Sequence, residues 1–236
     1  MQDPLVLLPG MMCDFRLFLP QIKAFGQERA VMVAPISNGA TILEIAQQAL
    51  AAAPERFALC GLSMGGIVAM EMSRIAPDRI TRIALLDTNP LSETPTVAAA
   101  REPQIIAAQS GRLAEVMREE MKPNYLAPGP RRNEVLQVVM DMAVDLGPEV
   151  FVRQSRALQK RADLQGALRR MAVPTLVACG EHDALCPVRR HEFMAELIPH
   201  AELRVIADAG HLPVLEQPEV TNEILRTWLS APLLLR

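Results

Sequence analysis

The 236-residue sequence has few aromatic residues and no long hydrophobic run. Phe, Trp and Tyr make up 3% of the chain, which favours an aliphatic binding pocket over one that recognises its ligand by ring stacking. No apolar segment approaches the roughly 20 residues that a helix needs to cross a membrane. The sequence therefore predicts no transmembrane helix.

An excess of basic residues is also missing. The chain has 24 Lys and Arg against 27 Asp and Glu, a formal net charge of −3 at pH 7. Nucleic acids and anionic membrane surfaces are bound mainly through basic patches, so neither is expected as a partner. The first residues, Met-Gln-Asp-Pro, lack the basic start and the long apolar run of a signal peptide. We therefore expect a cytoplasmic protein, whose oligomeric state the sequence does not indicate.

The four cysteines have no metal-binding spacing. Cys13, Cys60, Cys179 and Cys186 form neither a Cys-x-x-Cys pair nor a Cys/His cluster. Each is expected to be a small buried residue or a pocket-lining thiol rather than half of a disulfide. The sequence indicates no metal and no cofactor.

The most informative motif is the pentapeptide Gly61-Leu62-Ser63-Met64-Gly65. An apolar strand pattern over Phe57–Cys60 leads into it, and a helical pattern follows directly. A strand, a sharp turn and a helix are the context of a nucleophile elbow, which holds a serine hydroxyl exposed on a strained backbone. The glycines leave room for the strand and the helix to approach. We interpret Ser63 as a nucleophile.

Short apolar runs alternate with helical patterns along the chain, which is typical of βαβ units around a parallel sheet. Strands are predicted over Leu5–Leu8, Ala30–Val33, Phe57–Cys60, Ile80–Leu86, Thr175–Ala178 and Leu203–Ile206. Helices are predicted over Thr41–Ala52, where Thr41 is a suitable N-cap, and over Gly65–Ile75, Arg189–Leu197 and Thr221–Leu229.

Between residues 89 and 170 the strand pattern disappears. Helices are predicted there over Val97–Ser110, Leu113–Met121, Arg132–Leu146 and Glu149–Gln159. A simple crossover needs only about a dozen residues, so we predict a helical lid (89–170) inserted in a core formed by residues 1–88 and 171–236. Met121, Met140 and Met142 either fill the core or line an adaptable apolar pocket.

A serine nucleophile needs a base, and the base needs an acid that orients it. His211 follows the last predicted strand, and Asp183 follows the strand that begins at Thr175. Both positions lie at the carboxyl ends of parallel strands, where open α/β sheets place their sites. The chain order Ser, Asp, His agrees with an elbow of this kind. We interpret His211 as the base and Asp183 as the acid.

Other acids and histidines are alternatives or bystanders. Asp87 follows the fourth predicted strand and is a rival for the acid, whereas Asp208 is expected to stabilise the turn before His211. His191 and His200 are expected on the surface, and His182 is expected in the pocket or beside the acid. The oxyanion hole is expected to use the backbone N–H groups of Met64 and of Met11, which lies after the first strand.

These pieces together resemble the α/β-hydrolase superfamily over essentially the whole chain. The resemblance is greatest to its small lidded branch of esterases, enol-lactonases, BioH-type carboxylesterases and cofactor-free haloperoxidases. It rests on Pro9-Gly10, the Ser63 elbow, residues 167–177 before Asp183, and Gly210-His211 with residues 215–218 after it. The resemblance implies a mostly parallel sheet of about six strands, because the chain begins at the family's third strand, with helices on both faces. Pro9 stands where the family usually has His, which implies that the oxyanion loop is held differently.

The leading hypothesis is a serine hydrolase that cleaves a small carboxylic ester, lactone or thioester through an acyl-enzyme. Its partner would be a small-molecule substrate. One alternative uses the same triad as a base in a lyase or a C–C bond-cleaving enzyme. Another is a ligand-binding regulatory protein on the same scaffold, since fold alone does not establish function. Ser63 argues against an aspartate nucleophile.

Overall fold

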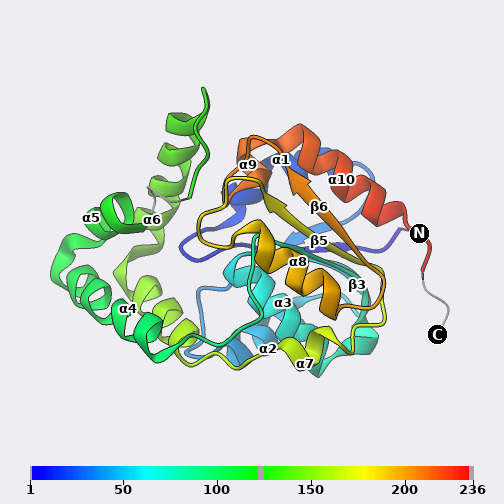
Figure 1. Cartoon of the computed structure of the whole chain (residues 1–236), viewed down its shortest axis with the longest axis horizontal. Coiled ribbons are helices and arrows are strands. Elements are labelled where there is room, and N and C mark those ends of the chain that lie inside the picture. The colour runs from blue at the N-terminus through cyan, green and yellow to red at the C-terminus, as the bar shows by residue number, and fades with distance from the viewer. Residues whose placement is uncertain (1, 122–124, 234–236) are drawn as a thin grey trace.

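A six-stranded parallel sheet forms the centre of the computed structural model, which describes residues 2–121 and 125–233 (Figure 1). The strand order is β2-β1-β3-β4-β5-β6, and each neighbouring pair is parallel. The strands are β1 (Leu5–Leu8), β2 (Val31–Val33), β3 (Phe57–Leu62), β4 (Ile80–Leu86), β5 (Thr175–Gly180) and β6 (Ala201–Ile206). The predicted strands and the predicted sheet are confirmed.

Helices cover both faces of the sheet, which Figure 1 shows as a layer between them. Successive strand residues point to opposite faces: in β1, Val6 and Leu8 pack into one core and Leu5 and Leu7 into the other. Burial on both faces explains why the inner strands β1 and β3 are continuous apolar runs. The first core packs against α2 (Ile42–Ala52), α3 (Met64–Ile75), α7 (Gln165–Leu168) and α8 (Val188–Leu197), and the second against α1 (Leu19–Phe25) and α10 (Pro218–Ser230).

Helix starts follow local chemistry. The Thr41 hydroxyl accepts a hydrogen bond from the Glu44 N–H and caps α2, as predicted. α10 begins at Pro218, three residues before its predicted start, because proline is well tolerated in the first turn. The sequence did not predict α1, whose seven residues give little helical periodicity. Short helical turns also occupy Phe15–Phe18, Pro77–Arg79 and α9 (Pro213–Glu216).

Residues 89–170, here called the helical insertion, lie between β4 and β5. Figure 1 shows its helices α4, α5 and α6 gathered on one side of the molecule, in green. Residue Gly147 (φ 78°), followed by Pro148, interrupts α6 at the point where the sequence divides it into two helices. The insertion contains α4 (Pro95–Ala107), a π-helical turn (Ala108–Arg112), α5 (Leu113–Glu115), a second π-helical turn (Val116–Met121), α6 (Arg132–Gln159) and α7.

The predicted role of three methionines is only partly described by the structure. Met140 and Met142 are buried in the two cores and do not line the large cavity described below. The side chain of Met121 lies outside the described part of the chain. Among the described residues, no helix is both long enough and apolar enough to cross a bilayer.

Candidate active site

Ser63 occupies a strained turn between β3 and α3, with φ 55° and ψ −117°. Such backbone angles are rare for residues other than glycine and concentrate at functional sites. Close backbone approaches surround the turn. A Cβ on Gly61 would lie 2.3 Å from the Gly65 carbonyl oxygen, and a Cβ on Gly65 would lie 2.1 Å from the Leu8 carbonyl oxygen. The spacing Gly-x-Ser-x-Gly is therefore required by the packing of three backbone segments.

The substitution Gly65→Ala is expected to destabilise the fold strongly. Its new methyl group would meet carbonyl oxygens of Leu8 and Pro9, which cannot rotate away as a side chain can. Overpacking a core costs about 1–3 kcal/mol, and we expect a loss at the upper end of that range in chemical denaturation. Gly129→Ala is the matched control, since a Cβ there meets nothing within 4 Å. Equal stability of the two variants would contradict the close approach.

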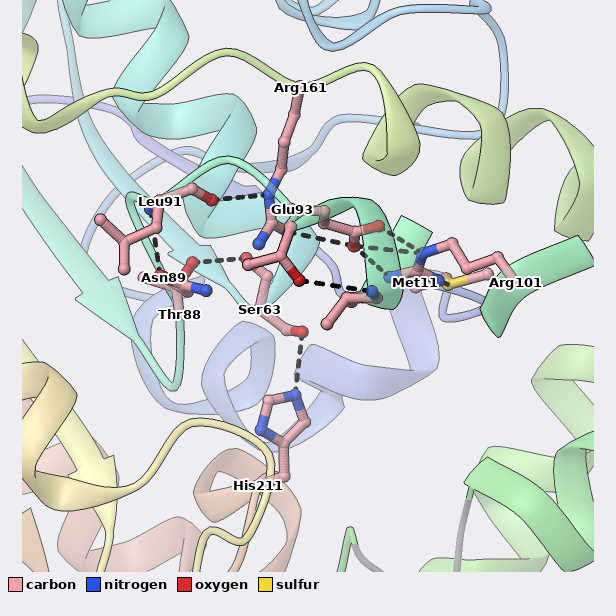
Figure 2. Close-up of polar contacts among 11 residues, drawn as sticks. Met11, Ser63, Thr88, Asn89, Leu91, Glu93, Arg101, Arg161 and His211 are labelled. Atoms are coloured by element: carbon pink, nitrogen blue, oxygen red, sulfur yellow. Dashed lines mark hydrogen bonds and ion pairs between the residues drawn. The ribbon is translucent and has the colours of Figure 1, made fainter. Parts of the chain in front are cut away.

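The structure brings the three predicted site residues into one hydrogen-bonded series. His211 Nε2 lies 2.8 Å from Ser63 Oγ, and His211 Nδ1 lies 2.8 Å from Asp183 Oδ2. Figure 2 shows the imidazole of His211 facing the Ser63 hydroxyl. Both His211 and Asp183 are almost fully buried, with 2% and 4% of their surface exposed. His211 and Asp183 come from the loops after β6 and β5.

The surroundings of Asp183 favour its ionised form. Its Oδ1 accepts hydrogen bonds from the backbone N–H groups of Leu185 (2.8 Å) and Cys186 (2.9 Å). Burial opposes ionisation, but the interaction with His211 and the Cys186 N–H outweigh it and hold the pKa of Asp183 below its usual value. A carboxylate in this position orients the imidazole and stabilises its protonated form.

Two residues that the sequence did not single out hold the His211 loop. The His211 N–H donates to the Tyr125 carbonyl oxygen at 2.6 Å, and the two rings lie 5.1 Å apart. The Glu216 carboxylate accepts from the backbone N–H groups of Gly210 (3.0 Å) and Leu212 (2.9 Å). These contacts tie the loop to the helical insertion and to α9.

The rival acids take other positions. Asp87 is fully buried, and its Oδ1 accepts the Gly180 N–H at 2.9 Å. Burial raises the pKa of Asp87 well above its usual value, and the nearby charge of Asp183 adds to the rise. Burial thus favours the protonated form of Asp87, whereas Asp183 is held in its ionised form. Asp208 is exposed on a turn with φ 55°. The structure thus pairs His211 with Asp183.

The prediction that His191 lies on the surface is wrong. The side chain is fully buried, because His191 and Met194 lie three residues apart on the face of α8 that covers the sheet. Its Nε2 accepts the Thr88 N–H at 3.0 Å, and the Thr88 hydroxyl donates to the Ser63 carbonyl oxygen at 2.7 Å. Burial lowers the pKa of His191 to about 4. A neutral His191 thus supports the segment that holds Ser63.

The remaining histidines lie outside the site. His200 is exposed, as predicted. The prediction for His182 is wrong, because its half-exposed side chain lies 3.9 Å from the Glu181 carboxylate and does not line the cavity. The turn after β5 directs Asp183 inward and its neighbour outward.

The helical insertion holds the loop after β1, where the sequence predicts one donor of an oxyanion hole. The Met12 N–H donates to Gln154 Oε1 at 2.8 Å, and Gln154 Nε2 donates to the Ile36 carbonyl oxygen at 3.2 Å. Gln154 of α6 thereby provides a support for a loop that lacks the histidine usual in the resembled family. Met11 and Met64 line the cavity beside Ser63, and neither backbone N–H has an acceptor among the described residues.

A cavity of about 520 Å³ opens over Ser63. Core residues and residues of the helical insertion both contribute to its wall. The sequence favoured an aliphatic pocket, but the wall also contains charged residues, namely Glu93, Arg101, Arg161 and Arg190. Cys186 also lines it, whereas the other three cysteines are buried.

Within the described part of the chain, one group could offer three metal ligands, namely Asp183, Cys186 and His211, whose donor atoms lie within 4.8 Å of one another. Both nitrogens of His211 are already engaged, with Asp183 and with Ser63. Burial also raises the pKa of the Cys186 thiol, which disfavours the thiolate that a metal requires. The arrangement therefore fits proton transfer better than metal binding.

Comparison with known proteins identifies the family. The model of the alpha/beta hydrolase family matches residues 6–224. The chain belongs to the alpha/beta hydrolase family. This alpha/beta hydrolase is 27% identical over 225 residues to a pimeloyl-(acyl-carrier protein) methyl ester esterase of Aromatoleum aromaticum, with 90% of this chain and 87% of the relative covered.

Solved structures agree. A thermophilic esterase from Thermogutta terrifontis superposes with a TM-score of 0.88 at 29% identity, covering 96% of this chain and 89% of that one. The enol-lactonase from Burkholderia xenovorans has the same fold, with a TM-score of 0.84 at 23% identity, covering 98% of this chain and 92% of that one. The predicted family, fold class and enzymatic nature of this alpha/beta hydrolase are confirmed.

Proposed function

We propose that this alpha/beta hydrolase cleaves a small carboxylic ester, lactone or thioester through an acyl-enzyme intermediate. The observation that carries the proposal is the series of two 2.8 Å contacts that joins Ser63, His211 and Asp183 at the base of the cavity. The names of the esterase relatives support the same class of reaction.

Each group has one task in the proposed reaction. Ser63 Oγ attacks the carbonyl carbon while His211 Nε2 takes its proton, and ionised Asp183 stabilises the imidazolium. The N–H groups of Met11 and Met64 hold the developing oxyanion, and losing one such donor typically costs about 2.7–4 kcal/mol of transition-state stabilisation. His211 then protonates the leaving group, and a water molecule releases the acyl group by the reverse sequence.

A fluorophosphonate serine probe tests the proposal directly. We expect covalent labelling of the wild-type enzyme at Ser63, followed by hydrolysis in a screen of p-nitrophenyl esters, lactones and acyl-CoA thioesters. Labelling without hydrolysis of any of these would favour the alternative in which the triad serves as a base in a lyase or a C–C bond-cleaving enzyme. An unlabelled, folded enzyme would refute a nucleophilic Ser63.

We further propose that the helical insertion acts as a lid that selects the acyl chain. Residues of α4 and α6, among them Val97, Ala100 and Leu158, line the cavity over Ser63. Replacing residues 95–121 by a Gly/Ser linker keeps Gln154 and Tyr125, which hold the loops at Met12 and His211, and is expected to preserve labelling by a small serine probe. The same variant should lose its chain-length preference among p-nitrophenyl esters, because one wall of the acyl pocket is removed.

A point variant keeps this prediction testable if the truncated protein aggregates. Ala100→Trp places a large side chain in the cavity from α4, and we expect hydrolysis of long-chain esters to fall more than hydrolysis of the acetate ester. Unchanged chain-length preference in both folded variants would show that the core loops build the pocket.

A further inference from the structure

The charged residues of the cavity do not balance. Arg101, Arg161 and Arg190 line it together with a single carboxylate, that of Glu93. The side chains of Arg161 and Glu93 are only 9% and 2% exposed. Buried charges in proteins are normally paired, because an unpaired charge loses its hydration without compensation. Three guanidinium groups around one carboxylate leave a surplus of positive charge beside the Ser63 hydroxyl.

Arg101 donates hydrogen bonds to both carboxylate oxygens of Glu93. Its Nε lies 3.1 and 3.0 Å from the two carboxylate oxygens, and its Nη2 lies 2.6 Å from Oε1. Arg161 Nη1 is 3.8 Å from the same Oε1, which is beyond hydrogen-bond distance. Figure 2 shows both guanidinium groups approaching Glu93. This bidentate pair therefore satisfies Arg101 and leaves Arg161 without a hydrogen-bonded anion.

Arg161 has donors that remain free for a ligand. Its Nε donates to the Leu91 carbonyl oxygen at 2.9 Å, which fixes the orientation of the guanidinium group. Among the described residues, its Nη groups have no hydrogen-bond acceptor. Burial lowers the pKa of Arg161; Glu93 opposes this shift, and the positive charges of Arg101 and Arg190 add to it.

Arg190 is the second cation of the cavity that lacks a hydrogen-bonded anion among the described residues. It lies in the first turn of α8, in the core, whereas Arg161 lies in the helical insertion. The backbone N–H of Arg190 donates to the Pro187 carbonyl oxygen. Its side chain forms no ion pair with any residue in the described ranges 2–121 and 125–233. The core and the helical insertion thus each contribute one uncompensated guanidinium group to the same cavity.

We propose that Arg161 and Arg190 form a subsite for a carboxylate group of the substrate, so that the enzyme acts on esters, lactones or thioesters that carry a free carboxylate away from the reacting carbonyl. The planar guanidinium group matches the two oxygens of a carboxylate and binds them through charge-assisted hydrogen bonds. The inference rests on the proposed hydrolase function and extends it to a substrate class.

A matched pair of substrates tests the subsite. The p-nitrophenyl monoester of glutaric acid and p-nitrophenyl pentanoate have the same five-carbon acyl chain and differ in the terminal carboxylate. We expect the wild-type enzyme to prefer the glutarate ester in kcat/KM, after subtraction of spontaneous hydrolysis. Arg190→Gln and Arg161→Gln should each reduce that preference about tenfold to 100-fold, the scale of a charge-assisted hydrogen bond, mainly through KM.

The control is Arg189→Gln, which removes the neighbouring, exposed guanidinium on α8 that does not line the cavity. It should keep the wild-type preference, whereas equal losses in both α8 variants would indicate long-range charge instead of a subsite. Arg190→Gln changes a half-buried residue without an ion pair, so we expect it to fold, with circular dichroism as the check. A preference unchanged within about threefold in both folded cavity variants would overturn the proposal.

Binding to Ser63→Ala separates this inference from the hydrolase proposal. Calorimetry with monomethyl glutarate and neutral dimethyl glutarate measures recognition without turnover. We expect binding of the monoanion that weakens when Arg190→Gln is added. Such binding in an enzyme that hydrolyses none of the esters, lactones and thioesters of the screen would retain the subsite and refute the hydrolase proposal. Hydrolysis of both esters at equal rates, without binding of the monoanion, would do the reverse.

Discussion

Ser63→Ala is expected to abolish hydrolysis and to leave the fold intact. In a serine protease, removing the triad serine lowers kcat by about 10⁶-fold, which sets the scale expected here. Alanine fits the turn because the substitution removes only the hydroxyl oxygen and leaves the close backbone approaches at Gly61 and Gly65 unchanged. Ester hydrolysis, probe labelling and thermal unfolding together measure the effect.

Ser73→Ala is the matched control for this substitution, since Ser73 lies on α3, the helix that follows Ser63, but does not line the cavity over Ser63. It should retain both labelling and turnover. If Ser63→Ala kept more than about 1% of the wild-type activity, its residual activity would far exceed the expected level. Such a result would point to a base-only mechanism or to another site.

Asp183→Asn is expected to lower kcat by about 10⁴-fold, the loss measured when an amide replaces the triad acid of a serine protease. The amide cannot stabilise the imidazolium, and it favours the wrong tautomer of His211, whose Nδ1 lies 2.8 Å from Asp183 Oδ2. Steady-state kinetics on one ester, with circular dichroism to verify folding, is the measurement.

Asp87→Asn is the informative comparison, because Asp87 was the rival acid. Burial favours the neutral form of the Asp87 carboxyl, which an amide resembles, and asparagine retains an oxygen that can accept the Gly180 N–H. We therefore expect less than about a tenfold loss of kcat, as for a residue that does not carry the reaction's charge. A larger loss at Asp87 than at Asp183 would transfer the role of the acid to the loop after β4.

Local sequence signals were sufficient for the sheet and for the strained turn at Ser63. Strands buried on both faces are short apolar runs, and the Ser63 turn needs its glycines at fixed offsets, so both are visible in a few consecutive residues. Asp183 and His211 could be placed because loops at the carboxyl ends of parallel strands converge. The kink at Gly147-Pro148 likewise has a local cause.

Contacts between distant segments could not be read in the same way. His191 has polar neighbours in sequence, and only the packing of α8 against the sheet shows that it contacts Thr88. The support of Met12 by Gln154 joins residues 142 positions apart. The three arginines of the cavity come from α4, from the segment after α6 and from α8, and their common environment exists only in the folded chain.

The hydrogen bond between Gln154 and Met12 links the helical insertion to the loop that carries Met11. Met12 has φ 55°, a conformation that a non-glycine residue keeps only while its surroundings enforce it. If the second half of α6 moves away to admit substrate, the enforcing partner leaves with it, and the neighbouring Met11 N–H loses its fixed direction. The enzyme would then be inactive with the insertion open and active with it closed. Amide hydrogen exchange at Met12 that stays slow while the insertion exchanges fast would contradict this coupling.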